Sequence, residues 1–118
     1  MEELFDLYKE DNRIEVKKAK NGLPLSLWET YSAMANTYGG VIILGIKEQA
    51  NRNWKTTGLK VSDREKLLDD FWNQMHNLQK VNVNLLDEND VKTYVVNEDL
   101  ILVIYVPMAK REQKPVYI

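Results

Sequence analysis

The chain has 118 residues, 44% of them hydrophobic, which is enough for one domain with a single core. It contains no cysteine, which excludes disulfides, thiolate metal sites and cysteine nucleophiles and fits a cytoplasmic location. With 16 basic and 18 acidic residues the formal net charge is −2, so binding to a polyanion requires a local basic patch.

The first part of the chain has the pattern of a strand, a helix and a second strand. Polar and apolar residues alternate over Arg13 to Lys17, which predicts a half-buried strand with Ile14 and Val16 on its core side. Ser26 to Glu29 has the form of a capping box that opens a helix, and Gly39 suits the positive φ that ends one. The apolar stripe of this helix is Leu27, Trp28, Tyr31, Ala35 and Tyr38.

A buried strand and a second helix are predicted next. Val41 to Ile46 is apolar without alternation, which favours a central strand covered on both faces, and Gly45 within it indicates a close approach by another group. Ser62 to Glu65 is a second capping box pattern. The packed face of the helix that follows is Leu67, Leu68, Phe71, Trp72 and Met75.

The last part of the chain has the pattern of an antiparallel meander with short polar turns. Its predicted strands are Val81 to Leu86, Val91 to Val96 and Leu100 to Val106.

The longest apolar run of the chain is far shorter than the ~20 residues of a membrane span, so no membrane partner is expected. Because Pro115 to Ile118 starts another alternating segment and stops, residues 1–118 are interpreted as one domain, the N-terminal fragment of a longer protein. The expected fold is α+β, with a mixed five- to six-stranded sheet and two main helices.

Several motifs in this order resemble those of one known family. Glu10 to Lys17 resembles a pattern of Glu, four residues, Glu, an aromatic or aliphatic residue and Lys. Ser32 to Gly40 is similar to "SAxANTxGG", and the strand that follows ends in Leu44 to Ile46, where the family has an apolar residue, Gly and Val. Val103 to Pro107 and Lys114 to Tyr117 are similar to the closing "VPxS…kPvy". Together they resemble a Schlafen-type AlbA domain, also called a divergent AAA domain, of prokaryotic transcriptional regulators.

The resemblance implies a domain that associates with DNA or RNA and is followed by C-terminal domains in the parent protein. The name AAA suggests an ATPase, but the chain has no G-x-x-x-x-G-K-[ST] loop to cradle phosphates. Gly39 and Gly40 are followed by a predicted strand instead of a lysine and a helix. We therefore expect no ATP hydrolysis and no cofactor.

Nucleic-acid binding needs Lys and Arg side chains that replace condensed counterions, together with polar groups that hold the register. Lys17 occupies the lysine position of the family motif, and a second basic group lies at Lys110, Arg111 and Lys114. A solvated charged face is the alternative interpretation. The predicted nucleic-acid-binding residues are Arg13, Lys17, Lys18, Lys20, Asn36, Gly39 and Gly40.

Two other functions stay open. Some Schlafen proteins resemble metal-dependent endoribonucleases with three acidic residues, which by position are Glu10, Glu15 and Glu48 here. Such carboxylates would hold Mg²⁺ or Mn²⁺, although Lys47 and Glu48 stand where an aspartate is expected. The third function is protein interaction or dimerisation, in which the strand at the C-terminal end pairs with a second copy.

Overall fold

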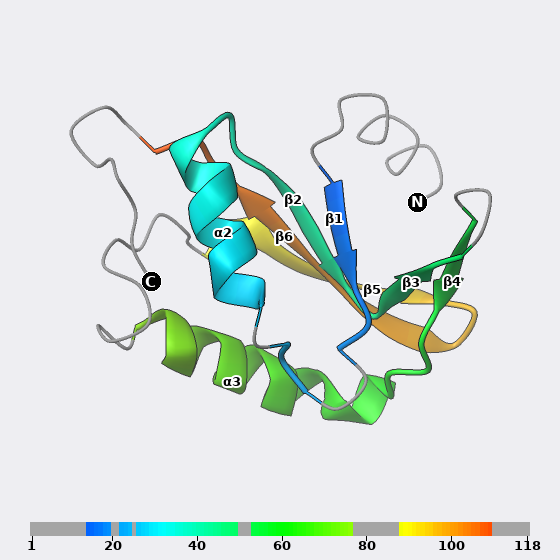
Figure 1. Cartoon of the computed structure of the whole chain (residues 1–118). Helices are drawn as coiled ribbons and strands as arrows, with labels where there is room; N and C mark the ends of the chain where they lie inside the picture. Colours follow the sequence, from blue (N-terminus) through cyan, green and yellow to red (C-terminus); the bar gives the residue numbers. More distant parts are fainter. Residues whose placement is uncertain (1–13, 20–21, 25, 50–52, 77–87, 110–118) are drawn as a thin grey trace.

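The computed structural model describes residues 14–19, 22–24, 26–49, 53–76 and 88–109, and it has the expected α+β architecture (Figure 1). Within these ranges, no helix is long and apolar enough to cross a membrane. The strands are β1 (Ile14–Lys17), β2 (Gly40–Leu44), β3 (Ile46–Glu48), β4 (Trp54–Thr56), β5 (Val91–Val96) and β6 (Asp99–Val106). The helices are α2 (Leu27–Asn36) and α3 (Arg64–Met75), with short 3-10 turns at Val61–Asp63 and Glu88–Asp90.

Four of the strands form a mixed sheet in the order β1-β2-β6-β5. β1 is parallel to β2, as expected for a strand-helix-strand start, and the other two pairings are antiparallel. β2 and β6 occupy the centre, which agrees with the continuous apolar sequence of each. β3 and β4 form a separate antiparallel sheet of two strands, so the six strands are divided between two sheets.

The prediction of one strand from Val41 to Ile46 is wrong, because the chain bends at Gly45 between β2 and β3. Gly45 has φ +98°, and a Cβ there would lie 2.8 Å from the carbonyl oxygen of Leu100 and 2.9 Å from Leu59 Cδ1. The predicted close approach at this glycine is therefore confirmed. The bend at Gly45 changes the direction of the chain, so that β3 leaves the main sheet (Figure 1).

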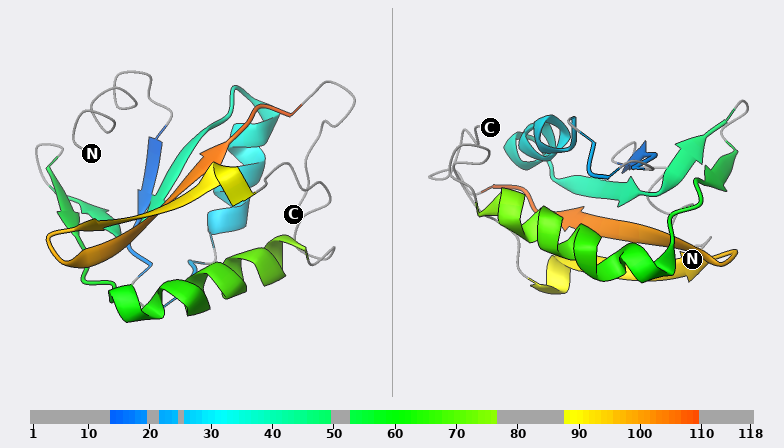
Figure 2. Two further views of the ribbon diagram at one scale, coloured as in Figure 1. Left: turned by 180° about the vertical axis from the view of Figure 1, so that it is seen from behind. Right: turned by 90° about the horizontal axis from the view of Figure 1, so that it is seen from below.

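The two helices pack on one face of the main sheet (Figure 2). Their predicted faces are largely confirmed, because Leu27, Trp28, Tyr31 and Ala35 of α2 are buried, as are Leu67, Phe71 and Met75 of α3. The exception is Tyr38, which is 71% exposed because α2 ends before it. Ile14 and Val16 do pack inward, but on the opposite face, against a second cluster that includes Val41 and Val103.

Neither predicted capping box forms. Ser26 is the N-cap residue of α2, but its backbone is helical and its hydroxyl makes no capping hydrogen bond. That hydroxyl instead accepts a hydrogen bond of 2.8 Å from Lys17 Nζ on β1. α3 is preceded by the 3-10 turn Val61–Asp63, which makes Asp63 its N-cap in place of Ser62.

The predicted positive φ of Gly39 is confirmed at +75°. Its amide donates a hydrogen bond of 2.7 Å to the carbonyl oxygen of Met34, which satisfies one of the last acceptors of α2. A Cβ at this position would lie 2.5 Å from the carbonyl oxygen of Val106. Only glycine therefore lets the helix end pack this closely on the end of β6.

The hairpin of β5 and β6 confirms two of the meander strands, and its turn consists of Asn97 and Glu98. Both have positive φ, 52° and 68°, which is the type I′ geometry that matches the twist of a hairpin. The predicted strand Val81 to Leu86 and the segment Pro115 to Ile118 lie outside the described residues.

Replacement of Glu98 by glycine is expected to raise the free energy of unfolding by about 0.5–1 kcal/mol, because glycine adopts a positive φ without a Cβ penalty. Glu98→Ala is the control, since it removes the same carboxylate and keeps the strain. Thermal denaturation followed by circular dichroism measures both variants. Equal stabilisation by alanine and glycine would show that the gain in stability comes from removal of the carboxylate, which would contradict the backbone explanation.

Candidate nucleic-acid interface

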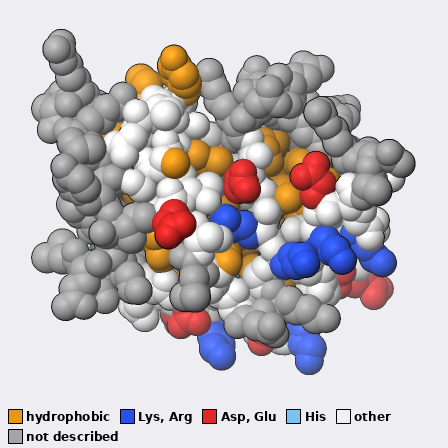
Figure 3. Space-filling view, in the orientation of Figure 1, with side chains coloured by type: hydrophobic (Ala, Val, Ile, Leu, Met, Phe, Trp, Pro, Cys, Tyr) orange, Lys and Arg blue, Asp and Glu red, His pale blue; other side chains and the backbone are white. Residues whose placement is uncertain are grey.

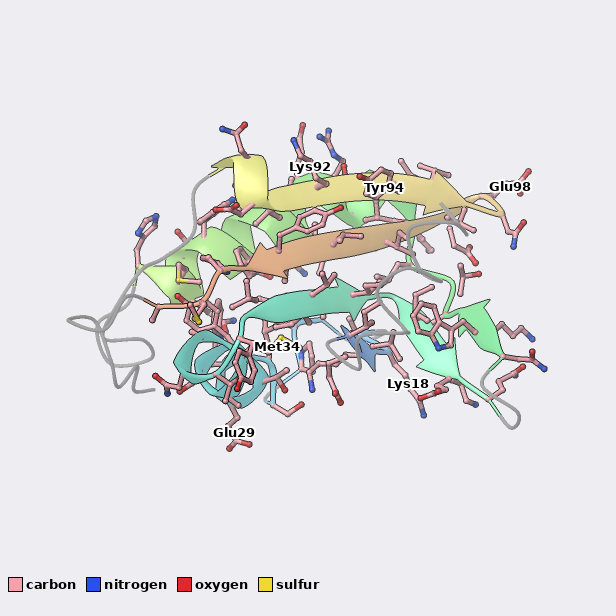
Figure 4. The ribbon with its side chains drawn as sticks, turned by 90° about the horizontal axis from the view of Figure 1, so that it is seen from above. Lys18, Glu29, Met34, Lys92, Tyr94 and Glu98 are labelled. Carbon is pink, nitrogen blue, oxygen red and sulfur yellow. The ribbon has the colours of Figure 1, made fainter. Side chains whose placement is uncertain are left out.

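The end of β1 is joined to the base of the β3–β4 hairpin by one hydrogen bond between backbone groups and one from a side chain. The amide of Gly45 donates to the carbonyl oxygen of Lys17 at 2.8 Å. The hydroxyl of Thr57, just after β4, donates to the carbonyl oxygen of Lys18, also at 2.8 Å. Lys18 is exposed, and Figure 4 shows it beyond the end of β1, beside β3 and pointing away from the sheet.

Two further lysines face each other on this hairpin. Lys47 on β3 is the direct cross-strand partner of Lys55 on β4, and both side chains are exposed. Directly opposed side chains of an antiparallel pair have Cβ atoms about 4.5–5.5 Å apart, and like charges in such a pair destabilise it. The stability of the hairpin therefore does not explain why two lysines are paired. Binding of one anion by both lysines would explain it.

We call the basic corner the group formed by Lys18, Lys47 and Lys55. Figure 3 shows Lys and Arg side chains gathered on the face that carries the hairpin and the end of β1. In the part of the chain that the structure describes, no carboxylate forms an ion pair with these three ammonium groups. All three side chains are exposed, which makes them candidates for contact with an anion.

Lys17 and Lys18 differ in accessibility although they are adjacent in sequence. Lys17 is half-buried, and its ammonium group already donates to Ser26, whereas Lys18 is exposed. Lys18 is therefore the stronger candidate for a phosphate contact. The remaining predicted basic residues, Arg13, Lys20, Lys110, Arg111 and Lys114, lie outside the described residues.

The predicted polar residues at the end of α2 lie away from the basic corner. Gly40 begins β2, and the hairpin follows its other end, so the length of this strand, roughly 13 Å, separates them. The buried Gly39 amide is bonded to Met34, and Asn36 Nδ2 donates to Ser32 Oγ at 3.4 Å. Among the predicted binding residues that the structure describes, Asn36, Gly39 and Gly40 thus lie apart from Lys17 and Lys18.

Of the three acidic residues considered for metal binding, Glu15 and Glu48 are described, and Glu10 is not. Glu15 lies on β1 opposite Ile42 of the main sheet, and Glu48 lies on β3 opposite Trp54 of the hairpin. No group of three His, Cys, Asp or Glu side chains in the described ranges could hold a metal ion.

The sequence did not point to Lys47 and Lys55 as candidate binding residues. Their signal is weak, because their pairing depends on the bend at Gly45 and on the register of the hairpin. Trp54 is half-buried and packs against the cluster of Val41 and Ile46.

Comparison with protein families identifies the domain. The family model described as Schlafen, AlbA_2 matches residues 10–117, nearly the whole chain. The chain belongs to the Schlafen AlbA_2 family. The resemblance seen in its motifs is thereby confirmed, although no curated protein matches the chain.

A solved structure supports the same assignment for this Schlafen AlbA_2 domain. It is the solution NMR structure of the N-terminal domain of a Nitrosomonas europaea protein described as related to the ATP-dependent DNA helicase RecG. The two sequences are 31% identical, and the TM-score is 0.70. The match covers 95% of this chain and 77% of the other.

Proposed function

We propose that this domain binds nucleic acid through the basic corner, as part of a longer cytoplasmic transcriptional regulator. The observation that carries the proposal is that the end of β1, followed by Lys18, lies beside the β3–β4 hairpin, which carries the exposed Lys47 and Lys55. Lysines in such a group displace condensed counterions when they contact phosphates, which drives binding even when the net charge is negative. Arg13 and Lys20 stay proposed contributors because they are close to Lys18 in sequence.

The family assignment supports a role in nucleic-acid biology, and the name of the RecG-related neighbour refers to a DNA helicase. That name describes the neighbour alone. Pairing of two copies and catalysis by Glu10, Glu15 and Glu48 stay alternatives without a specific structural observation in their favour.

The test is a fluorescence-anisotropy titration of the chain against a labelled DNA duplex and a labelled RNA hairpin at several salt concentrations. We expect saturable binding that weakens as salt rises. The variant Lys18→Gln is expected to reduce the slope of log affinity against log salt by about one, since one phosphate contact is lost. Lys92→Gln is the matched control, because Lys92 is exposed on β5 at the far edge of the sheet (Figure 4).

The alternatives predict different results. An absence of binding to both probes at low salt would refute the proposed function. Cleavage of the RNA probe that requires a divalent ion and disappears in Glu15→Gln would support the endoribonuclease. Equal salt slopes for Lys18→Gln and Lys92→Gln would remove Lys18 from the interface.

A further inference from the structure

We propose that the β3–β4 hairpin enters the major groove of duplex DNA. In this arrangement Lys47 and Lys55 contact backbone phosphates, and Gln49 and Asn53 reach the edges of the bases. The inference rests on the proposed function and deepens it, because it names the ligand as a DNA duplex and specifies how the domain meets it.

The hairpin has the shape of a β-ribbon that stands away from the main sheet (Figures 1 and 2). The amide of Gln49 donates to the carbonyl oxygen of Asn53 at 2.7 Å, so backbone pairing continues one step beyond β3 and β4. Residues 46–49 span three steps of strand, roughly 10 Å, compared with a major groove about 8.5 Å deep. Its width of about 12 Å admits a two-stranded ribbon.

The base of the hairpin is held firmly against the domain. The amide of Thr57 donates to the carbonyl oxygen of Gly45 at 3.0 Å, and the hydroxyl of Thr56 donates to Asp99 Oδ2 at 2.5 Å. Trp54 packs against the apolar cluster on the sheet face opposite the helices. A ribbon fixed in this way loses little conformational freedom on binding, which favours affinity.

The two faces of the hairpin differ in charge. Side chains alternate along a strand, so Lys47 and Lys55 share one face, whereas Glu48 and Trp54 share the other. Both lysines therefore meet the same side of the groove, and the exposed carboxylate of Glu48 points away from the phosphates that they contact. The carbonyl oxygen of Lys18 is bonded to Thr57 at the base of the hairpin, so its exposed side chain adds a third ammonium group to this part of the domain.

The residues just beyond the paired strands have the chemistry of base recognition. Gln49 and Asn53 are both exposed, and each ends in a carboxamide with a donor and an acceptor. A carboxamide of this kind can bond to both N6 and N7 of adenine in the major groove. The ribbon thus combines phosphate contacts at its sides with readout of bases toward its end.

Two other nucleic acids fit this geometry less well. The major groove of an A-form RNA helix is deep and narrow, so a ribbon with side chains cannot enter it. Single strands are bound largely by stacking on aromatic rings. In residues 46–49 and 53–56, the aromatic side chain is Trp54, which is half-buried in packing.

The experiment uses anisotropy with a DNA duplex, an RNA duplex of the same sequence and single-stranded DNA. The double variant Lys47→Gln/Lys55→Gln is compared with Lys66→Gln/Lys92→Gln, which removes two exposed charges on α3 and β5. Methyl green, a major-groove ligand, and netropsin, a minor-groove ligand, are used as competitors. Circular dichroism confirms that each variant is folded.

We expect the DNA duplex to bind most tightly and methyl green to displace the protein. The hairpin variant should reduce the salt slope by about two, and the control variant should leave it unchanged. In a selection from duplexes with a randomised segment, Gln49→Ala/Asn53→Ala should lose at least about fivefold of its preference for its selected site, with its salt slope intact.

The outcomes separate this inference from the proposed function. If the protein binds nucleic acid but Lys47→Gln/Lys55→Gln has the slope of the unmodified chain, the hairpin is not the contact, although the proposed function stands. Displacement by netropsin alone, or tighter binding to RNA duplex or single strand, overturns insertion in the major groove. An absence of binding to every probe refutes both.

Discussion

Replacement of Gly39 by alanine is expected to lower the free energy of unfolding by about 3–5 kcal/mol. A Cβ at this position meets the carbonyl oxygen of Val106 at 2.5 Å and the amide nitrogen of Met108 at 3.0 Å. Both are backbone atoms, so the end of β6 must move away from α2 to relieve the contact. The positive φ of +75° adds a conformational penalty of about 1–2 kcal/mol.

Gly58→Ala is the matched control for this prediction. Gly58 also has a positive φ, +87°, but a Cβ there has no atom within 4 Å. The control therefore measures the cost of the backbone conformation alone, about 1–2 kcal/mol. Chemical denaturation of the two variants gives the difference. An equal loss of stability would show that the approach of Gly39 to β6 carries no energetic weight.

Reversal of the two hairpin charges in Lys47→Glu/Lys55→Glu is expected to reduce affinity for a DNA duplex by about a hundredfold at moderate salt. The change removes two phosphate contacts and places two carboxylates against the same backbone, where they are repelled. Both side chains are exposed, so their replacement leaves the core intact. Anisotropy titration of the folded variant gives the ratio of affinities.

The variant Lys66→Glu/Lys92→Glu changes the net charge equally, because both of these lysines are also exposed. It separates a local effect of the hairpin from a general effect of negative charge, which screening reduces over distance. A similar loss of affinity in both variants would indicate that overall charge, not the basic corner, controls binding. We expect the control to lose only a few-fold in affinity.

Much of the fold could be predicted from local patterns. The strand Val91–Val96 has the predicted bounds, and the buried faces of α2 and α3 follow their helical spacing. Both predictions are correct because the periodicity of apolar side chains indicates which face of a strand or helix is buried. The family was also identifiable, because its motifs are short segments whose order does not depend on the tertiary arrangement.

The capping of α2 shows where local patterns are insufficient. Ser26 and Glu29 have the spacing of a capping box, yet the hydroxyl of Ser26 accepts from Lys17, which arrives on a different strand. A residue nine positions earlier in the chain has replaced the local donor. Sequence spacing cannot rank a local hydrogen bond against one that depends on the packing of β1.

The sequence alone thus determined the two helices and the strands β1, β5 and β6, most of their buried faces, and the family. These features depend on interactions between residues close in the chain. Only the tertiary structure decided the place of the candidate site. The bend at Gly45 separates β3 from β2, and the register of the hairpin then sets Lys47 opposite Lys55. Leu100 and Leu59, which are distant in sequence, approach the bend so closely that only a residue without a side chain fits there.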